Sequence, residues 1–145
     1  VQERNITKIY WALVENAPEQ PEGRLVHFMK KNEALNKSVA INEEKKEYQR
    51  AELEYKVLGK SRNYTLLEIS LLTGRHHQIR AQLAAIGTSI KGDLKYGAKR
   101  SNKDGSIALH AIKIQFYHPV NKENIILKAP ILNSEFLKII SQINI

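Results

Sequence analysis

The sequence contains no cysteine, and its only aspartates are Asp93 and Asp104. The absence of cysteine excludes disulfides and thiolate metal sites and is compatible with a cytoplasmic protein. No apolar run approaches the ~20 residues that a membrane-spanning helix requires, and the first residues do not form a secretory signal. We therefore expect a cytoplasmic protein that does not enter a membrane.

A methionine at the start is also missing. The chain begins with Val1, and its only methionine is Met29. A translated protein starts with methionine unless it is trimmed, so we expect a piece of a longer protein. With 145 residues, of which 42% are hydrophobic, the piece has the size of a single domain over residues 1–145.

Charge is abundant and unbalanced. The net charge is +8 and the isoelectric point is near 9.7, which raises the expectation of a polyanionic partner such as RNA or DNA. Many basic domains bind no nucleic acid, so charge alone leaves both alternatives open.

Hydrophobic periodicity predicts more strands than helices. Alternating and β-branched runs favour strands over residues 7–14, 25–29, 38–41, 46–58, 64–72, 107–117 and 124–128. Loops are expected over residues 16–23, 30–37, 59–63 and 89–105, with His118-Pro119 closing a strand. The sum is an α+β domain with a mainly antiparallel or mixed sheet and a few flanking helices.

Two helices complete the expected fold. Residues 76–86 place Ile79, Leu83 and Ile86 on one face, and Gly87 suits a left-handed stop. A last helix is expected to be capped by Ser134 and to dock through Phe136, Leu137 and Ile140. The positions that we assign to the core rather than to function are Ile79, Leu83, Ile86, Leu67, Ile69 and Leu71.

The most informative segment is Thr73-Gly74-Arg75-His76-His77-Gln78-Ile79-Arg80. It joins a predicted strand to a predicted helix and combines a turn glycine with arginine, histidine and glutamine side chains. Such a junction lets backbone N–H groups and side chains converge on a ligand.

This segment closely resembles the TGRTHQIR signature of RluA-type RNA pseudouridine synthases, with His76 where threonine is commonest. Three other segments resemble the family in the same order. They are Lys8 to Val14 (K-x-Y-x-A-L-V), Gly87 to Gly97 (G-x-P-I-x-G-D-x-x-Y-G, with Ser89 in place of proline), and Leu109-His110-Ala111 with Phe116 to Pro119 (L-H-A … F-x-H-P).

The resemblance implies an enzyme that isomerises uridine to pseudouridine in ribosomal or transfer RNA, without a cofactor or metal. In the family a nucleophilic aspartate comes from an Arg-Leu-Asp segment, and the sequence contains no such segment. We therefore expect the carboxy-terminal part of a pseudouridine synthase catalytic domain that is inactive in isolation. A non-catalytic RNA-binding module is the alternative, and an interaction domain with incidental charge is a third.

Two residues are implied to be catalytic. The tyrosine of K-x-Y, here Tyr10, lies against the target uracil in the family and has been viewed as a base for the C5 proton. A core tyrosine is the simpler interpretation from the residue alone. The arginine of TGR, here Arg75, pairs with the catalytic aspartate, since a guanidinium can hold a carboxylate bidentately and remains charged. Without that partner we expect an exposed or anion-bound Arg75, because a buried unpaired charge is costly.

The remaining candidates concern RNA binding. His77 and Gln78 are expected to brace the loop or to touch phosphate, and Arg80 to contact phosphate or to lie on a solvated helix face. The adjacent histidines should point to different faces of a helix, which argues against a shared metal. The full set of RNA-binding candidates is Lys8, His76, His77, Gln78, Arg80, Lys91, Lys95, Lys99 and Arg100.

Several of these basic residues, together with Lys103, lie in the glycine-punctuated loop, where a solvated loop is almost as good an interpretation as a phosphate contact. Asp93 is expected to cap the turn before Tyr96-Gly97, and Asp104 to be exposed in a turn. We expect a monomeric parent enzyme. The incomplete sheet of the piece would leave an edge at which an artificial dimer could form.

Overall fold

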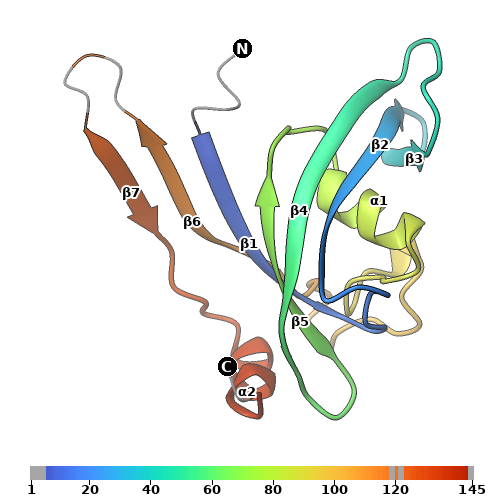
Figure 1. Cartoon of the computed structure of the whole chain (residues 1–145). Coiled ribbons are helices and arrows are strands. Elements are labelled where there is room, and N and C mark those ends of the chain that lie inside the picture. Colours follow the sequence, from blue (N-terminus) through green and yellow to red (C-terminus); the bar gives the residue numbers. More distant parts are fainter. Residues whose placement is uncertain (1–5, 118–119, 121–122, 144–145) are drawn as a thin grey trace.

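The structure, a computed structural model, describes residues 6–117, 120 and 123–143. Its strands are β1 (Ile6–Val14), β2 (Glu22–Asn32), β3 (Lys37–Ile41), β4 (Gln49–Lys60), β5 (Thr65–Leu71), β6 (Leu109–Tyr117) and β7 (Asn124–Lys128). They form one sheet in the order β3-β2-β4-β5-β1-β6-β7 (Figure 1). Every neighbouring pair is antiparallel, so the α+β prediction with a mainly antiparallel sheet is confirmed.

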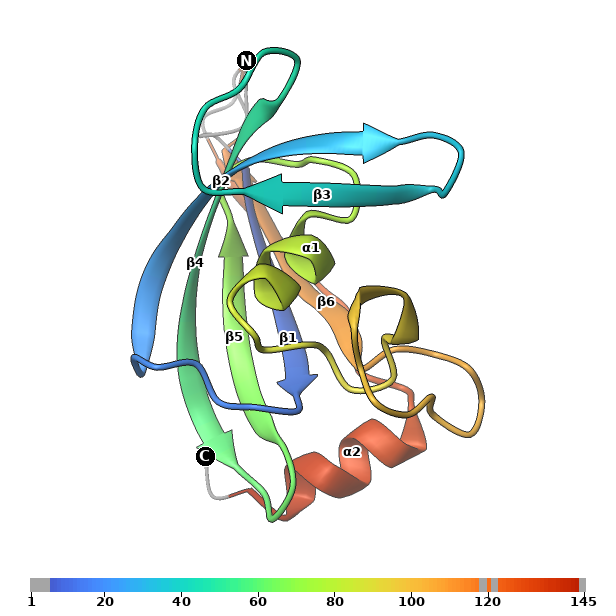
Figure 2. The ribbon, with the colours of Figure 1, turned by 90° about the vertical axis from the view of Figure 1, so that its right-hand side faces the viewer.

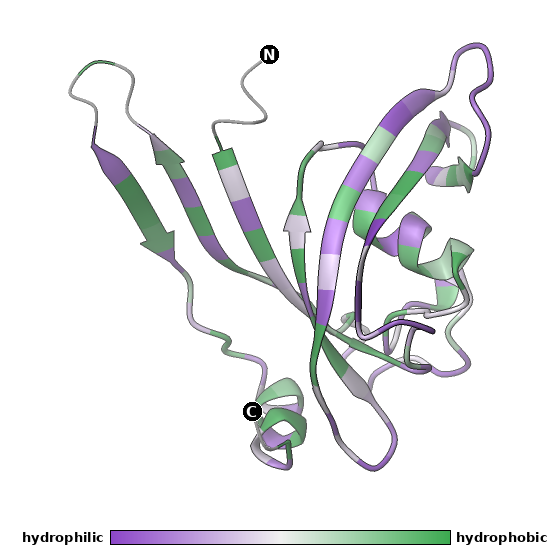
Figure 3. Cartoon of the chain, viewed as in Figure 1, coloured by the Kyte–Doolittle hydropathy of each residue, from purple (hydrophilic) through white to green (hydrophobic). Residues whose placement is uncertain are grey.

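The two faces of the sheet differ in polarity. Ala51, Leu53 and Tyr55 of β4 are buried on one face, whereas Glu52 and Glu54 point to the other, because successive side chains of a strand alternate. Figure 3 shows this alternation as hydrophilic and hydrophobic bands along β4. The sequence pattern of β4 thus decides which face receives α1.

The helix α1 (Gln78–Ala85) covers the apolar face, as Figure 2 shows. Ala81 of this helix joins Met29 and Ala51 in one buried cluster, and Ile79 and Leu83 belong to the main core with Leu53 and Ile69. A short 3-10 helix, η2 (Leu94–Tyr96), lies in the long loop after α1, and α2 (Ser134–Ser141) inserts Phe136 into the core. Among the described residues, no helix is long and apolar enough to cross a membrane.

Several predicted element ends were wrong. The strand expected over residues 25–29 extends over Glu22–Asn32, because Lys31 and Asn32 pair with β3 and Glu22 and Gly23 pair with β4. The connection expected over 30–37 therefore shrinks to residues 33–36. Charged side chains near the ends of β2 hide its alternation of apolar and polar residues. The strand β4 also continues through the turn expected at residues 59–63 as far as Lys60, with a bulge between Val57 and Gly59.

The helix predictions were right in place and wrong in detail. α1 begins at Gln78 rather than at residue 76, because His77 adopts a left-handed conformation with φ 54°. Ile86 is 37% exposed and is not a core residue. The cap of α2 is Asn133, whose side chain accepts a hydrogen bond from the Phe136 N–H; Ser134 is already helical. Leu137 is 45% exposed and does not dock. The expected strand end at His118-Pro119 lies outside the described residues.

Candidate active site

The turn that follows β5 is held by the backbone of Glu52 in β4. The Glu52 carbonyl accepts hydrogen bonds from the N–H groups of Leu72 at 3.0 Å and Thr73 at 3.3 Å. In the opposite direction, the Glu52 N–H donates to the Thr73 hydroxyl at 2.9 Å. The backbone of β4 therefore fixes the start of the turn that carries Arg75.

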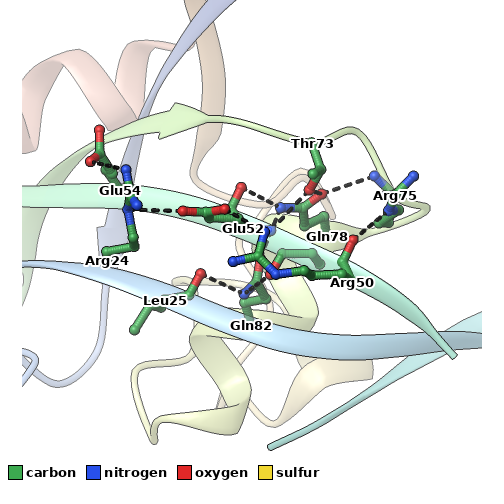
Figure 4. A network of polar contacts seen from close by, with 10 residues as sticks. Arg24, Leu25, Arg50, Glu52, Glu54, Thr73, Arg75, Gln78 and Gln82 are labelled. Carbon is green, nitrogen blue, oxygen red and sulfur yellow. Dashed lines mark hydrogen bonds and ion pairs between the residues drawn. The ribbon is translucent and has the colours of Figure 1, made fainter. Parts of the chain in front are cut away.

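Gln78 holds the same turn from the helix side (Figure 4). Its Oε1 accepts from the Thr73 hydroxyl at 2.8 Å and from the Arg75 N–H at 2.9 Å. Its Nε2 donates to the Glu52 carbonyl at 3.1 Å and to Gln82 Oε1 at 2.9 Å. Gln78 is 3% exposed, so this side chain braces the loop, and a contact with phosphate would require the network to open.

Arg75 is half-buried at the rim of this turn. Its Nε donates to the backbone carbonyl of Arg50 at 2.8 Å, as Figure 4 shows. The hydrogen bond from Nε fixes the orientation of the guanidinium. This lowers the entropic cost of forming the bidentate pair for which an arginine is suited.

Behind the turn, the Glu52 carboxylate joins two arginines. Arg24 Nε lies 2.9 Å from one carboxylate oxygen and Arg50 Nη1 lies 2.6 Å from the other. The Glu52 side chain is only 10% exposed, whereas the arginines are more than half exposed. A nearly buried carboxylate with two charged donors is well satisfied, and it fixes the part of β4 that carries the Arg50 carbonyl.

Tyr10 lies on the interior strand β1, directly opposite Ile69 of β5. Opposed residues of an antiparallel pair project from the same face, so Tyr10 shares the face of Ile69 and of Tyr55, which is the face that α1 covers. Its ring is partly buried against the main core. Ile69 stands two residues before the end of β5 at Leu71, so Tyr10 and the turn of Arg75 lie toward the same end of the sheet. A β-bulge between Ile9 and Tyr10 shifts the pairing with β6, and such bulges re-aim side chains.

The sequence predicts that the side chains of His76 and His77 diverge, but the two rings stack on each other. Their ring centroids are 3.8 Å apart with an interplanar angle of 27°, because the left-handed backbone of His77 keeps it out of the helix. His76 Nδ1 lies 2.8 Å from the Ser38 hydroxyl, and His77 Nδ1 lies 2.8 Å from the Tyr96 hydroxyl. Within the described residues, no group of three or more His, Asp or Glu side chains gathers as a metal site would require.

The neutral form of His77 follows from its neighbours. Arg80 Nη1 can only donate, and it lies 3.2 Å from His77 Nε2, so Nε2 accepts and the proton resides on Nδ1. Burial, and secondarily the positive charge of Arg80, lower the pKa of His77 to about 4. The His77 Nδ1–H and the Ser38 N–H then both donate to the Tyr96 hydroxyl, which ties the loop to β3.

Arg80 is neither solvated nor directed at open solvent. Its guanidinium forms a two-pronged ion pair with Asp93 and lies 4.8 Å over the Tyr96 ring. Asp93 was expected to cap the following turn; it occupies the N-cap position of η2, but its side chain makes no capping hydrogen bond. The carboxylate is 1% exposed and binds Arg80 instead, while the Asp93 carbonyl accepts from Tyr96 N and Ala98 N.

The basic residues of the long loop fall into two groups. Lys91 is 7% exposed; its ammonium donates to Asn102 and pairs with Glu135 at 3.2 Å, so it ties the loop to α2. Lys95, Lys99 and Arg100 are exposed, although Lys95 Nζ donates to the carbonyls of Leu35 and Asn36. Asp104 is exposed, as expected, and hydrogen bonds from Ser106 lower the pKa of its carboxyl.

Four residues that organise the site were not among the candidates predicted from the sequence: Glu52, Gln82, His27 and Ser38. Each has a partner that is 21 to 58 residues away along the chain. Only Gln82 gave a local hint, since it lies four residues after Gln78 and thus on the same helix face.

Comparison with known proteins identifies the family of this chain. Residues 1–85 match the sequence model of the family described as RNA pseudouridylate synthase. Ribosomal large subunit pseudouridine synthase D of Haemophilus ducreyi is 31% identical over 97% of this chain and 46% of that protein. Synthase C of Buchnera aphidicola is 33% identical over 90% of this chain and 44% of that protein.

A solved structure supports the fold. Human RNA Pseudouridylate Synthase Domain Containing 4 aligns with a TM-score of 0.75 at 20% identity, over 99% of this chain and 65% of that one. The chain thus spans less than half the length of the curated relatives just named. On its sequence match, the chain belongs to the RNA pseudouridylate synthase family.

Proposed function

We propose that this chain is the carboxy-terminal part of the catalytic domain of an RNA pseudouridine synthase, and that the nucleophilic aspartate comes from another part of the protein. The observation that carries the proposal is the braced turn. Arg75 is fixed by β4 and by Gln78 at the end of the sheet toward which Tyr10 also lies. Without the aspartate, the chain alone does not form pseudouridine.

The reaction assigns a role to each of the two residues. The C1′–N1 bond of a uridine breaks, the base turns, and a bond to C5 forms, after the nucleotide has left the stack. Arg75 holds the aspartate ionised and aligned through its guanidinium. Tyr10 offers a flat apolar ring against the uracil and a hydroxyl near the C5 proton. None of these steps is an oxidation, so the proposal includes no cofactor or metal.

The RNA backbone is proposed to lie against the exposed basic side chains. Lys95, Lys99 and Arg100 of the long loop are the best placed, and half-buried Lys8, two residues before Tyr10 on β1, is a weaker candidate. The other candidates form contacts within the protein and shape this surface; they are His76, His77, Gln78, Arg80 and Lys91.

Ribosomal RNA is the favoured substrate because two relatives are named for the large ribosomal subunit. Transfer RNA is the alternative, and the location would be cytoplasmic.

The full-length enzyme is proposed to be a monomer. In the chain alone, the edge strand β7 exposes Ile126 and Leu127 by 49% and 55%, and Figure 3 shows this strand as mostly hydrophobic. An exposed apolar edge invites pairing with another copy, so a dimer of the isolated chain would be artificial.

The test compares the chain with the full-length protein encoded by the same gene. The codons upstream of Val1 are read first, and an Arg-Leu-Asp segment within a few tens of codons is expected. Pseudouridine formation in ribosomal RNA is then measured for both proteins. Activity in the full-length protein alone supports the proposal. Activity of the isolated 145-residue chain contradicts it. RNA binding without activity in either protein would favour a non-catalytic RNA-binding module.

A further inference from the structure

A buried chain of hydrogen bonds connects Arg75 to His27 on β2. The Arg75 N–H donates to Gln78 Oε1 at 2.9 Å, and Gln78 Nε2 donates to Gln82 Oε1 at 2.9 Å. Gln82 Nε2 lies 2.8 Å from His27 Nδ1. The exposed fractions of Gln78, Gln82 and His27 are 3%, 0% and 4%, so water cannot replace a lost bond without entering the core.

The direction of every bond in this chain is determined by two backbone groups. The Arg75 N–H can only donate and the Glu52 carbonyl can only accept, so Gln78 must present Oε1 to the first and Nε2 to the second. Gln82 must then present its oxygen to Gln78 and its Nε2 to His27. The Gln82 Nε2 also lies 3.4 Å from the carbonyls of Leu25 and Ala51, which is consistent with this orientation.

His27 is consequently required to accept at Nδ1. Its ring must be neutral, with its proton on Nε2. Burial lowers the pKa of His27, which favours this neutral form. A side chain without an acceptor at this position would leave the Gln82 amide only its two 3.4 Å contacts with the carbonyls of Leu25 and Ala51, and a weakly satisfied buried donor is costly. The least costly relief is rotation of Gln82, which breaks its bond to Gln78 and frees the brace of the Arg75 turn.

We propose that His27 is a positioning residue for Arg75, because it terminates the hydrogen-bond chain that keeps Gln78 oriented toward the Arg75 N–H. The inference rests on the proposed function for its catalytic consequence. The structural coupling between His27 and the turn does not depend on that function. The structure thus assigns a role in the site to a residue on β2, which lies two strands away from β5, the strand that precedes the turn of Arg75.

The test uses substitutions that differ in one acceptor. Asparagine places an amide oxygen near the position of Nδ1, whereas glutamine places its amide near Nε2 and leucine offers no acceptor. His27→Asn should therefore preserve the chain, and His27→Gln and His27→Leu should break it. The Asn and Gln variants are both polar, so this pair carries the test if the leucine variant does not fold. His110→Leu is the matched control, because His110 Nε2 is buried without a hydrogen-bond partner among the described residues.

The first measurement is amide hydrogen exchange at Arg75 in the 145-residue chain, followed by NMR. His27→Gln and His27→Leu should speed exchange at Arg75 on the order of ten-fold relative to wild type, since a local brace is lost. His27→Asn and His110→Leu should leave it within about two-fold. Equal exchange at Arg75 in the Asn and Gln variants would overturn the proposed coupling.

The second measurement is turnover of the full-length protein. Misplacement of a catalytic group mainly affects the chemical step. His27→Gln should therefore lower kcat on the order of ten-fold with KM nearly unchanged, and His27→Asn should restore kcat. An active wild type with equal kcat in both variants overturns the positioning role. An inactive wild type instead contradicts the proposed function, and amide exchange then decides the coupling alone.

Discussion

Arg80 donates hydrogen bonds to both carboxylate oxygens of Asp93, with Nε 2.9 Å from Oδ2 and Nη2 2.7 Å from Oδ1. The ion pair joins α1 to the loop of η2 across 13 positions of the chain. Asp93 is 1% exposed, so its charge depends on Arg80 for compensation. The pair is therefore a structural element of the site, and the hydrogen bond to Asp93 raises the pKa of Arg80 further.

Removing Arg80 should lower the free energy of unfolding far more than removing an exposed charge. Arg80→Ala leaves the Asp93 carboxylate buried and unpaired, and we expect a loss of about 3 kcal/mol in the free energy of unfolding. Lys30→Ala is the control, because Lys30 and Glu47 are both about half exposed or more, and such pairs contribute about 0–1 kcal/mol. Urea denaturation measures both. Similar losses in the two variants would show that Asp93 is compensated by other groups.

His77 makes the stability of this region dependent on pH. In the folded protein its pKa is about 4, against the ordinary value of 6.5, because burial and Arg80 disfavour the charged form. The unfolded chain therefore binds a proton at a higher pH than the folded protein does. The stabilisation by neutral His77 is complete above about pH 6.5 and is lost as the pH falls toward about 4.

We expect His77→Asn to flatten this pH dependence. Asparagine tolerates the left-handed backbone of residue 77 and does not titrate. Between pH 6.5 and 4, the free energy of unfolding should fall less steeply in the variant than in the wild type. Buried His27 and half-buried His110 also have lowered pKa values, so some slope remains. An unchanged slope in the variant would mean that His77 does not titrate in this range.

Local patterns predicted the sheet well where a strand carries its own alternation. The strand over residues 64–72 and the apolar positions Leu67 and Ile69 were found from the sequence alone, and both side chains are 0% exposed. The bracing alternative for Gln78 is likewise the one that the structure favours. The left-handed His77 and the pairing of Arg80 with Asp93 depend on contacts between distant segments, which leave no local period. This is why the predicted helix start and the predicted cap by Asp93 were wrong.

The start of α2 offers a direct check of one such correction. Asn133 accepts from the Phe136 N–H at 2.9 Å and also donates to Asp104 at 3.1 Å. Asn133→Ala should therefore cost about 1–2 kcal/mol of stability. Ser134→Ala should change stability by no more than about 0.5 kcal/mol, because Ser134 is exposed inside the first turn. Thermal and urea unfolding of the two variants give the comparison, and a larger loss at Ser134 would restore the cap predicted from the sequence.

Tyr10 can be tested by the removal of one oxygen atom. In the full-length protein, Tyr10→Phe keeps the ring that packs against the core and should retain RNA binding. If the hydroxyl assists removal of the C5 proton, turnover should fall by about 100-fold or more. Tyr117→Phe is the control, because Tyr117 lies on β6 and is 48% exposed. Turnover of Tyr10→Phe close to that of the control would leave Tyr10 as a packing residue.

The exposed basic residues of the long loop can be tested by salt dependence. Each phosphate contact releases counterions, so the slope of log affinity against log salt is about −0.7 per contact for single-stranded RNA. The double variant Lys99→Glu and Arg100→Glu should reduce the steepness of this slope by about 1.4 if both side chains contact phosphate. The control reverses the same amount of charge at Lys128 and Lys138, which are exposed on β7 and α2. If both double variants reduce the slope equally, net charge rather than a defined contact binds RNA. If neither does, these side chains belong to a solvated loop, and the RNA path must cross a different surface of the chain.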